Sequence, residues 1–168
     1  MSSRRAPQWG RTSTSRPKGF GDTRCVLGGR RIIDEAELWI EAASASQRQD
    51  GYFGPVANLT NIHTEHDHKP GLWPNMIMLM ALQSYHERSG DKRVLDLVTR
   101  YFRWEAGTPE EDFLLPFRQQ QRAADNLAGV YWLYNRTGKE WLLDLATTIQ
   151  SLGRTKQVCW CGRESRPC

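Results

Sequence analysis

The sequence predicts an all-α fold built of antiparallel helix hairpins. Two observations carry this prediction: apolar residues recur with helical spacing through residues 32–151, and one hairpin pattern repeats at a fixed interval. Stacked hairpins of this kind form α-solenoids or α/α toroids. A closed α/α toroid needs more helices than this sequence offers, so we expect an incomplete one.

Five helices are expected, separated by residues that favour turns. Asp50-Gly51 follows the first helix, Gly90 precedes the third, and Gly138 separates the last two. The run from Met76 to Leu82 is apolar on every side, which predicts a helix that is buried on every side. Residues 51–73 are expected to form a long loop. The expected helices cover residues 34–47, 74–89, 92–104, 125–135 and 140–150.

The repeat has an interval of 48 residues, which relates Gly90 to Gly138. The same interval relates Leu95-Asp96-Leu97 to Leu143-Asp144-Leu145. Each unit consists of a mostly apolar helix, a tight glycine turn and an amphipathic helix. We therefore expect the apolar helices to form an inner layer and the amphipathic helices an outer layer.

Charge divides the chain into three parts. The net charge of +4 combines +7 in residues 1–31, −6 in residues 32–151 and +3 in residues 152–168. We interpret residues 32–151 as the folded domain and both basic tails as disordered or non-native. The tails lack interleaved aromatic residues and any nucleic-acid motif, so nucleic-acid binding is not expected. No long apolar run and no secretory signal is present, so no membrane association is expected either.

Metal binding is not favoured by the cysteines or the histidines. One Cys-x-Cys pair is present without the second matched pair that a zinc site usually has. The segment 61–68 contains three histidines and two acids and could hold a transition metal, but no helix is expected there to set their spacing. We therefore expect no cofactor in this chain. The residues concerned are Cys25, Cys159, Cys161, Cys168, His63, His66 and His68.

Two segments suggest sugar binding. Tyr52 and Phe53 lie between glycines just after a helix, where their rings could stack on the apolar faces of a sugar or could simply cover the helix end. Trp73 and Asn75 lie at the start of the apolar helix. The Asn75 amide could bind a ligand hydroxyl or could cap the helix.

Asp125 and Asn126 begin the equivalent helix of the second unit and should lie near the same rim. Binding a ligand and capping the helix remain alternatives for Asp125. The acidic residues 110–112 follow Thr108 and Pro109 at an expected helix start, where the helix dipole explains them. No nucleophile motif, phosphate loop or separated carboxylate pair is present, so no catalytic residue is assigned.

Four segments together resemble the catalytic domain of glycoside hydrolase family 127, the β-L-arabinofuranosidase-like enzymes. The resemblance covers about residues 32–151 and implies an (α/α)₆ barrel that acts on carbohydrate. Its segments are Asp50-Gly51-Tyr52-Phe53-Gly54-Pro55, Leu72-Trp73-Pro74-Asn75-Met76, Arg100-Tyr101-Phe102-Arg103-Trp104, and Asp125-Asn126-Leu127 with Val130 through Gly138.

The resemblance also implies a retaining mechanism with a cysteine nucleophile bound to zinc and a glutamate as general acid/base. The tail cysteines do not stand in a matching context, so these roles are not carried over. The expected function is that of an N-terminal fragment of a glycoside hydrolase that acts on L-arabinofuranoside-type or related plant or microbial glycans, a fragment that is inactive alone because the zinc–cysteine centre is missing. The alternative is a helical-repeat interaction module. We also expect self-association, because an incomplete toroid would expose its apolar inner helices such as Met76 to Leu82.

Overall fold

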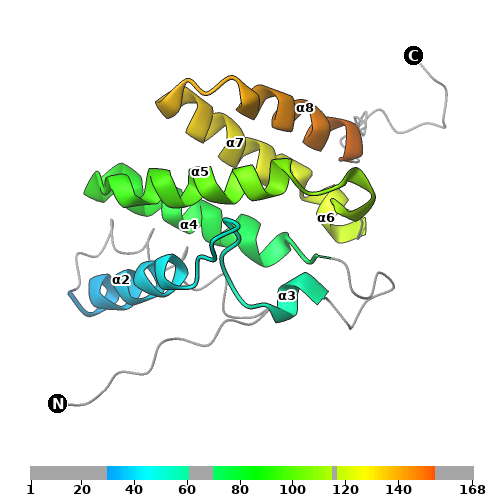
Figure 1. The fold of residues 1–168 in the computed structure, drawn as a ribbon. Coiled ribbons are helices and arrows are strands. Elements are labelled where there is room, and N and C mark those ends of the chain that lie inside the picture. The colour runs from blue at the N-terminus through cyan, green and yellow to red at the C-terminus, as the bar shows by residue number, and fades with distance from the viewer. Residues whose placement is uncertain (1–29, 61–69, 115–116, 154–168) are drawn as a thin grey trace, which may run out of the picture.

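The computed structural model describes residues 30–60, 70–114 and 117–153. Every regular element in these ranges is a helix (Figure 1), which confirms the predicted all-α class. No helix in the described ranges is long and apolar enough to cross a membrane. The elements are α2 (Arg30–Ala45), α3 (Ala57–Thr60), α4 (Trp73–Ser89), α5 (Lys92–Ala106), the 3₁₀ turn η1 (Glu110–Asp112), α6 (Phe117–Gln121), α7 (Ala123–Thr137) and α8 (Trp141–Leu152).

The two predicted hairpins are α4–α5 and α7–α8, and their turns have the same geometry. Gly90 has φ 67° and ψ 13°, and Gly138 has φ 63° and ψ 18°. This left-handed conformation favours glycine and ends each helix. The Gly90 N–H donates to the His86 carbonyl and the Gly138 N–H to the Tyr134 carbonyl, each at 2.8 Å. The interval of 48 residues therefore describes a structural repeat.

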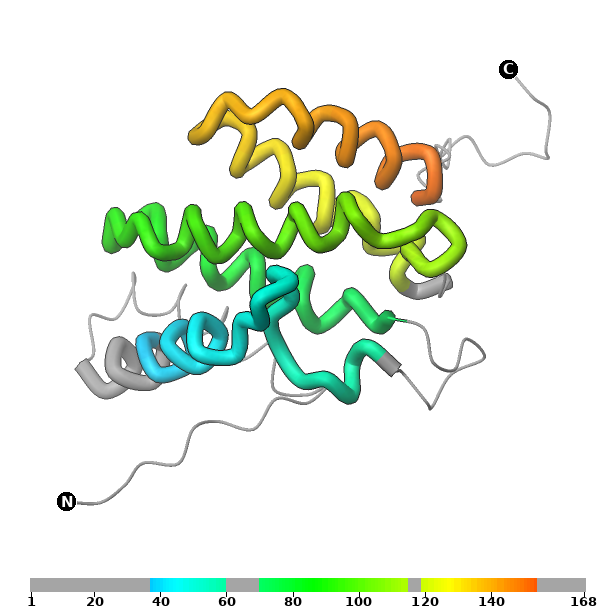
Figure 2. The backbone as a smooth tube through the Cα atoms, in the orientation of Figure 1, coloured from blue at the N-terminus to red at the C-terminus, as the bar shows by residue number. Residues whose placement is uncertain are grey.

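The four long helices of the repeat alternate in direction and pack in two layers. In Figures 1 and 2, both glycine turns lie at the same end of the molecule. Helix α4 contacts α7, and α5 contacts α8, while α5 also packs against both α4 and α7. The predicted inner pair is therefore α4 and α7, and the predicted outer pair is α5 and α8.

The outer helices bury equivalent stripes, because their apolar residues follow the spacing i, i+3, i+4, i+7. Every residue in both stripes is at most 4% exposed. The α5 stripe comprises Val94, Leu97, Val98 and Tyr101, and the equivalent α8 stripe comprises Leu142, Leu145, Ala146 and Ile149.

The two inner helices differ in how far they are buried. Of the seven residues from Met76 to Leu82, five are buried and the other two half-buried. The expectation that this run would be exposed is therefore wrong, because α5 and α7 cover α4; self-association itself stays a prediction. Helix α7 is buried along one stripe only, and Tyr131 remains 44% exposed.

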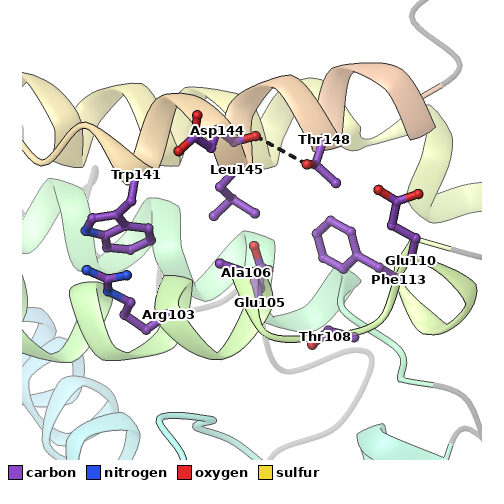
Figure 3. A pocket seen from close by; sticks show the side chains of 10 residues that line it. All are labelled: Arg103, Glu105, Ala106, Thr108, Glu110, Phe113, Trp141, Asp144, Leu145 and Thr148. Carbon is purple, nitrogen blue, oxygen red and sulfur yellow. Dashed lines mark hydrogen bonds between the residues drawn. The ribbon is translucent and has the colours of Figure 1, made fainter.

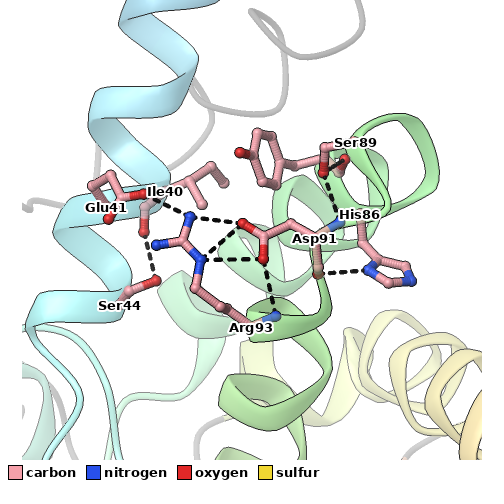
Figure 4. A network of polar contacts seen from close by, with 8 residues as sticks. Ile40, Glu41, Ser44, His86, Ser89, Asp91 and Arg93 are labelled. Atoms are coloured by element: carbon pink, nitrogen blue, oxygen red, sulfur yellow. Dashed lines mark hydrogen bonds and ion pairs between the residues drawn. The ribbon is translucent and has the colours of Figure 1, made fainter.

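An ion-pair network connects α2 to the first hairpin (Figure 4). The Arg93 guanidinium lies 2.9 Å from Glu41 on α2 and 2.7 Å from Asp91. Asp91 also caps α5, because its carboxylate accepts the Arg93 backbone N–H at 3.0 Å. These hydrogen bonds from Arg93 lower the pKa of Asp91. Since Arg93 and Glu41 are both more than half exposed, the ion pair between them contributes little to stability.

Three local expectations differ from the structure. Only the turn η1 follows Thr108, whose hydroxyl donates back to the Trp104 carbonyl at 3.0 Å instead of capping a helix. The short helix α3 lies in the expected loop, and α6 was not predicted. Helix α2 begins at Arg30, before the predicted boundary at residue 32. The remainder of both tails, residues 1–29 and 154–168, lies outside the described residues.

Candidate functional site

The six predicted sugar-binding residues separate into an exposed pair and a buried set. Trp73 and Asp125 are partly exposed at the N-terminal ends of α4 and α7. The other four are at most 2% exposed and belong to the core: Tyr52, Phe53, Asn75 and Asn126. Of the six predicted residues, Trp73 and Asp125 therefore present side chains at the surface, at the starts of the two inner helices.

Arg122 connects the exposed pair. Its guanidinium carbon lies 5.8 Å from the centre of the Trp73 ring, and its Nη1 lies 3.5 Å from the Asp125 carboxylate. We call Trp73, Arg122 and Asp125 the rim cluster. The Trp73 indole N–H has no hydrogen-bond partner within the described part of the chain.

The rim cluster has the groups that recognise sugars. An indole ring offers an apolar face, a guanidinium donates hydrogen bonds, and a carboxylate accepts them from hydroxyls. The Arg122–Asp125 separation is at the outer limit of a hydrogen bond, and both side chains are partly solvated. Both groups are therefore available to a ligand at little cost. Sequence analysis missed Arg122, because its approach to Trp73 depends on how α4 and α7 pack.

Tyr52 and Phe53 close the end of the core. The Asn75 side-chain amide donates to the Phe53 carbonyl at 2.7 Å, and the Tyr52 hydroxyl donates to the Pro55 carbonyl at 3.2 Å. The Tyr52 ring packs edge-on against Trp104, with ring centres 5.0 Å apart. Both rings are thus buried, which agrees with the interpretation that they cover a helix end and not with the one in which they stack on a sugar. Asn75 anchors their segment to α4 rather than capping a helix.

Asn126 faces a buried carboxyl that sequence analysis did not single out. The Asn126 amide donates to Glu105 Oε2 at 2.9 Å, and Glu105 is only 1% exposed. Burial raises the pKa of Glu105 to about 7, although the hydrogen bond from Asn126 opposes the rise. Glu105 follows Tyr101 by four residues on the buried stripe of α5. This spacing continues the buried stripe of α5 by one turn, and it is the feature of the sequence that could have predicted the burial of Glu105.

The zinc implied by the family resemblance finds no donor set among the described residues. No group of three or more His, Cys, Asp or Glu side chains in those residues is arranged to hold a metal ion. The predicted histidine-rich segment and all four cysteines lie outside the described ranges. We therefore assign no metal ligand and derive no step through a metal.

Comparison with known proteins identifies a family. The family model described as "Beta-L-arabinofuranosidase, GH127 catalytic domain" matches residues 18–158, a range that extends past both ends of the predicted domain. Neither the curated proteins nor the solved structures yield a match. The match spans most of the chain, and the all-helical hairpins agree with the (α/α)₆ toroid of this family. The chain therefore belongs to the GH127 catalytic-domain family of glycoside hydrolases.

Proposed function

We propose that the rim cluster contacts the sugar in a glycoside hydrolase that acts on L-arabinofuranosides or related glycans. The observation that carries this proposal is the grouping of Trp73, Arg122 and Asp125 at the N-terminal ends of the two inner helices. Trp73 supplies a stacking surface, while Arg122 and Asp125 hydrogen-bond to sugar hydroxyls.

In this proposal the buried set positions the rim. Asn75 lies two residues after Trp73 on α4, and its side-chain amide donates a hydrogen bond to the Phe53 carbonyl. This contact fixes the start of α4 against the segment that contains Phe53. Asn126 follows Asp125 on α7, and its side-chain amide donates a hydrogen bond to Glu105 on α5. Tyr52, Phe53, Asn75 and Asn126 are therefore positioning residues.

We further propose that the chain alone does not hydrolyse glycosides. Hydrolysis usually requires two carboxyl groups about 5–10 Å apart across the scissile bond, and the rim cluster contains one. The family resemblance implies a cysteine nucleophile on zinc, and the tail cysteines do not stand in a context that matches the family. The expected activity of this chain is therefore binding without turnover.

The test is calorimetric titration of the full chain with L-arabinose, together with an assay using an aryl L-arabinofuranoside. We expect weak binding and no release of the aryl group. Trp73→Ala, Arg122→Ala and Asp125→Asn should each weaken binding about five- to tenfold, as expected for losing one stacking or hydrogen-bonding contact.

The chain contains a matched control at the opposite end of α7. Arg136 lies over the Trp132 ring at 4.5 Å and pairs with Glu87, which repeats the chemistry of the rim cluster. Arg136→Ala should leave sugar binding unchanged. Equal losses in Arg122→Ala and Arg136→Ala would contradict the proposal. Absence of sugar binding, together with capture of a defined protein partner, would favour the helical-repeat interaction module instead.

A further inference from the structure

The far side of the second hairpin is uncovered, although the equivalent side of the first hairpin is covered. The interval of 48 residues relates positions on α7 and α8 to positions on α4 and α5. Six of these positions are more exposed in the second hairpin than in the first. We call the six residues of the second hairpin the open face: Ala124, Leu127, Ala128, Tyr131, Leu143 and Gln150, which are equivalent to Met76, Leu79, Met80, Gln83, Leu95 and Phe102.

The first hairpin shows what packs on this face. Gly129 of α7 approaches it so closely that an added Cβ would lie 3.1 Å from the Gln83 amide nitrogen and 3.2 Å from the Phe102 ring. Phe102 is fully buried, whereas its equivalent Gln150 is exposed. Tyr131, the equivalent of Gln83, is 44% exposed. The open face therefore repeats a helix-packing surface that no helix in the described part of the chain covers.

Helix α8 turns its other side toward the rest of the domain. Trp141 and Leu145 point toward α5 and line a cavity of about 290 Å³ between the two helices (Figure 3). Leu143 lies two residues from each of them, which places it on the opposite side of the helix. Its exposure of 38% agrees with this position. The open face is therefore separate from the cavity.

The open face lacks the charges that keep the end of a helix stack in solution. Repeat proteins need terminal repeats with a polar outer face for solubility. The six residues of the open face carry no charge. Depletion of charge is typical of the centre of a protein interface. Helix α5 shows the contrast, because most of its exposed residues are charged: Lys92, Arg93, Asp96, Arg100 and Arg103.

We infer that the open face is a dimerisation surface and that its partner is the open face of a second copy of this chain. Its α7 residues follow the spacing i, i+3, i+4, i+7 that is typical of a helix-packing stripe. A twofold axis across the middle of this stripe pairs α7 with its copy in antiparallel directions, so that Ala128 of each copy meets Tyr131 of the other. A small side chain then packs against a large one at both contacts, and no like charges meet.

The opposite end of the stack does not offer the same fit. Helix α2 lies there, on the far side of the first hairpin from α8 (Figures 1 and 2). Its exposed residues include Glu37 and Glu41. Packing α2 of a second copy on the open face would place these carboxylates against uncharged side chains, which costs desolvation energy. Pairing two open faces avoids this cost and closes the assembly at two copies.

The test is sedimentation velocity of the full-length chain, under reducing conditions that prevent disulfides between its four cysteines. We expect a monomer–dimer equilibrium over about 1–100 μM. Since the open face is uncharged, the dimer should persist when NaCl is raised from about 0.05 to 0.5 M. Association that salt abolishes would instead indicate contacts between the basic tails and the acidic domain, and it would overturn the inference.

Substitutions at exposed positions separate the open face from a general effect. Ala128→Arg and Tyr131→Arg place a charge on the face in both copies and should each weaken the dimer about tenfold or more. Ala106→Arg adds the same charge at an exposed position of α5, outside the open face, and should leave the dimer unchanged. Circular dichroism should show the same helix content in all three variants, so that a loss of dimer reports on the interface.

A mixture of two variants tests the twofold arrangement. Ala128 lies near its own copy beside the axis, so Ala128→Arg and Ala128→Glu should each be monomeric alone and should form a dimer when they are mixed in equal amounts. A packing of two different faces would not produce this rescue. Ala128 is outside the rim cluster, so Ala128→Arg should keep its binding of L-arabinose, and either proposal can fail without the other.

Three results would overturn the inference. The folded chain could remain monomeric well above the micromolar range, which would show that some other partner covers the open face. It could form assemblies larger than a dimer, as a head-to-tail packing does. Ala106→Arg could weaken the dimer as much as Ala128→Arg, which would place the interface elsewhere.

Discussion

The Asn126 side-chain amide donates a hydrogen bond of 2.9 Å to Glu105, and the two residues are 0% and 1% exposed. This contact joins inner helix α7 to outer helix α5 through a carboxyl group in the core. Neutral donors such as Asn126 and Tyr101 offset only part of the loss of water that a carboxylate suffers on burial. The protonated form of Glu105 is therefore favoured in the folded state.

The stability of the chain should consequently fall as the pH rises through the range that Glu105 titrates. The pKa of Glu105 is about 7 in the fold, against 4.5 for the ordinary side chain. Between these values the folded state binds more protons than the unfolded state, so a rise in pH favours unfolding. Urea denaturation should show a loss of roughly 3 kcal/mol from about pH 4.5 to pH 7.

Glu105→Gln is the matched variant for this effect. Its neutral amide oxygen can still accept from Asn126, so the loss of stability between about pH 4.5 and 7 should largely disappear. Glu110→Gln, at an exposed acid, should keep the pH dependence of the original chain. A free energy of unfolding that is flat or rising with pH in the unmodified chain would show that Glu105 is ionised in the fold.

Asn75→Ala should destabilise the domain by about 1–3 kcal/mol. The substitution removes the 2.7 Å hydrogen bond that the Asn75 side-chain amide donates to the Phe53 carbonyl, a contact between two buried residues. Asn135→Ala, at an exposed asparagine on α7, should change stability by less than about 0.5 kcal/mol. The midpoints of urea denaturation compare the two variants, and similar shifts would mean that the Asn75 contact contributes little.

Gly51→Ala should be among the most damaging single-methyl additions. Gly51 has φ 104°, and an added Cβ would lie 2.3 Å from the Arg100 carbonyl oxygen. Both the backbone conformation and the close approach oppose a side chain, so we expect a loss of more than about 1 kcal/mol. Gly107→Ala is the control, since its nearest neighbour would be 3.5 Å away. Thermal unfolding should show a clear drop for Gly51→Ala alone.

The repeat predicts paired effects in the outer helices. Leu97 and Leu145 are equivalent and each 4% exposed, so replacing either with alanine should cost about 2–5 kcal/mol. Leu143, two residues earlier on α8, is 38% exposed, and Leu143→Ala should cost less than half as much. If Leu97→Ala and Leu145→Ala differed widely in denaturant midpoint, the two hairpins would not be energetically equivalent.

Most of the helices could be predicted because their signals are local. The stripe that contains Val94, Leu97 and Val98 defines an amphipathic helix within its own segment, and the glycines at 90 and 138 mark turns that few other residues adopt. Helix α6 gave no such signal, because Phe117–Gln121 is short and lacks an apolar period. Thr108 and the residues after it are of the types that commonly begin a helix. In the structure, however, the Thr108 hydroxyl donates to the Trp104 backbone carbonyl and caps no helix.

The candidate site was predictable only in part. Trp73 and Asp125 were expected at one rim because the repeat places both at the starts of inner helices. Arg122 was not expected beside them, and Glu105 was not expected to face Asn126. These contacts join residues from different helices. No spacing along the chain encodes the side-chain directions that bring them together.

Local patterns were thus sufficient for the helix content, the glycine turns and the repeated hairpin, because backbone conformation and apolar periodicity act over a few residues. The packing of α4, α5, α7 and α8 settled the rest: which polar groups are buried, which face solvent, and where a cavity remains. Burial and desolvation depend on every element that surrounds a group. The same asparagine or glutamate is therefore a core residue or a surface ligand according to neighbours distant in the chain.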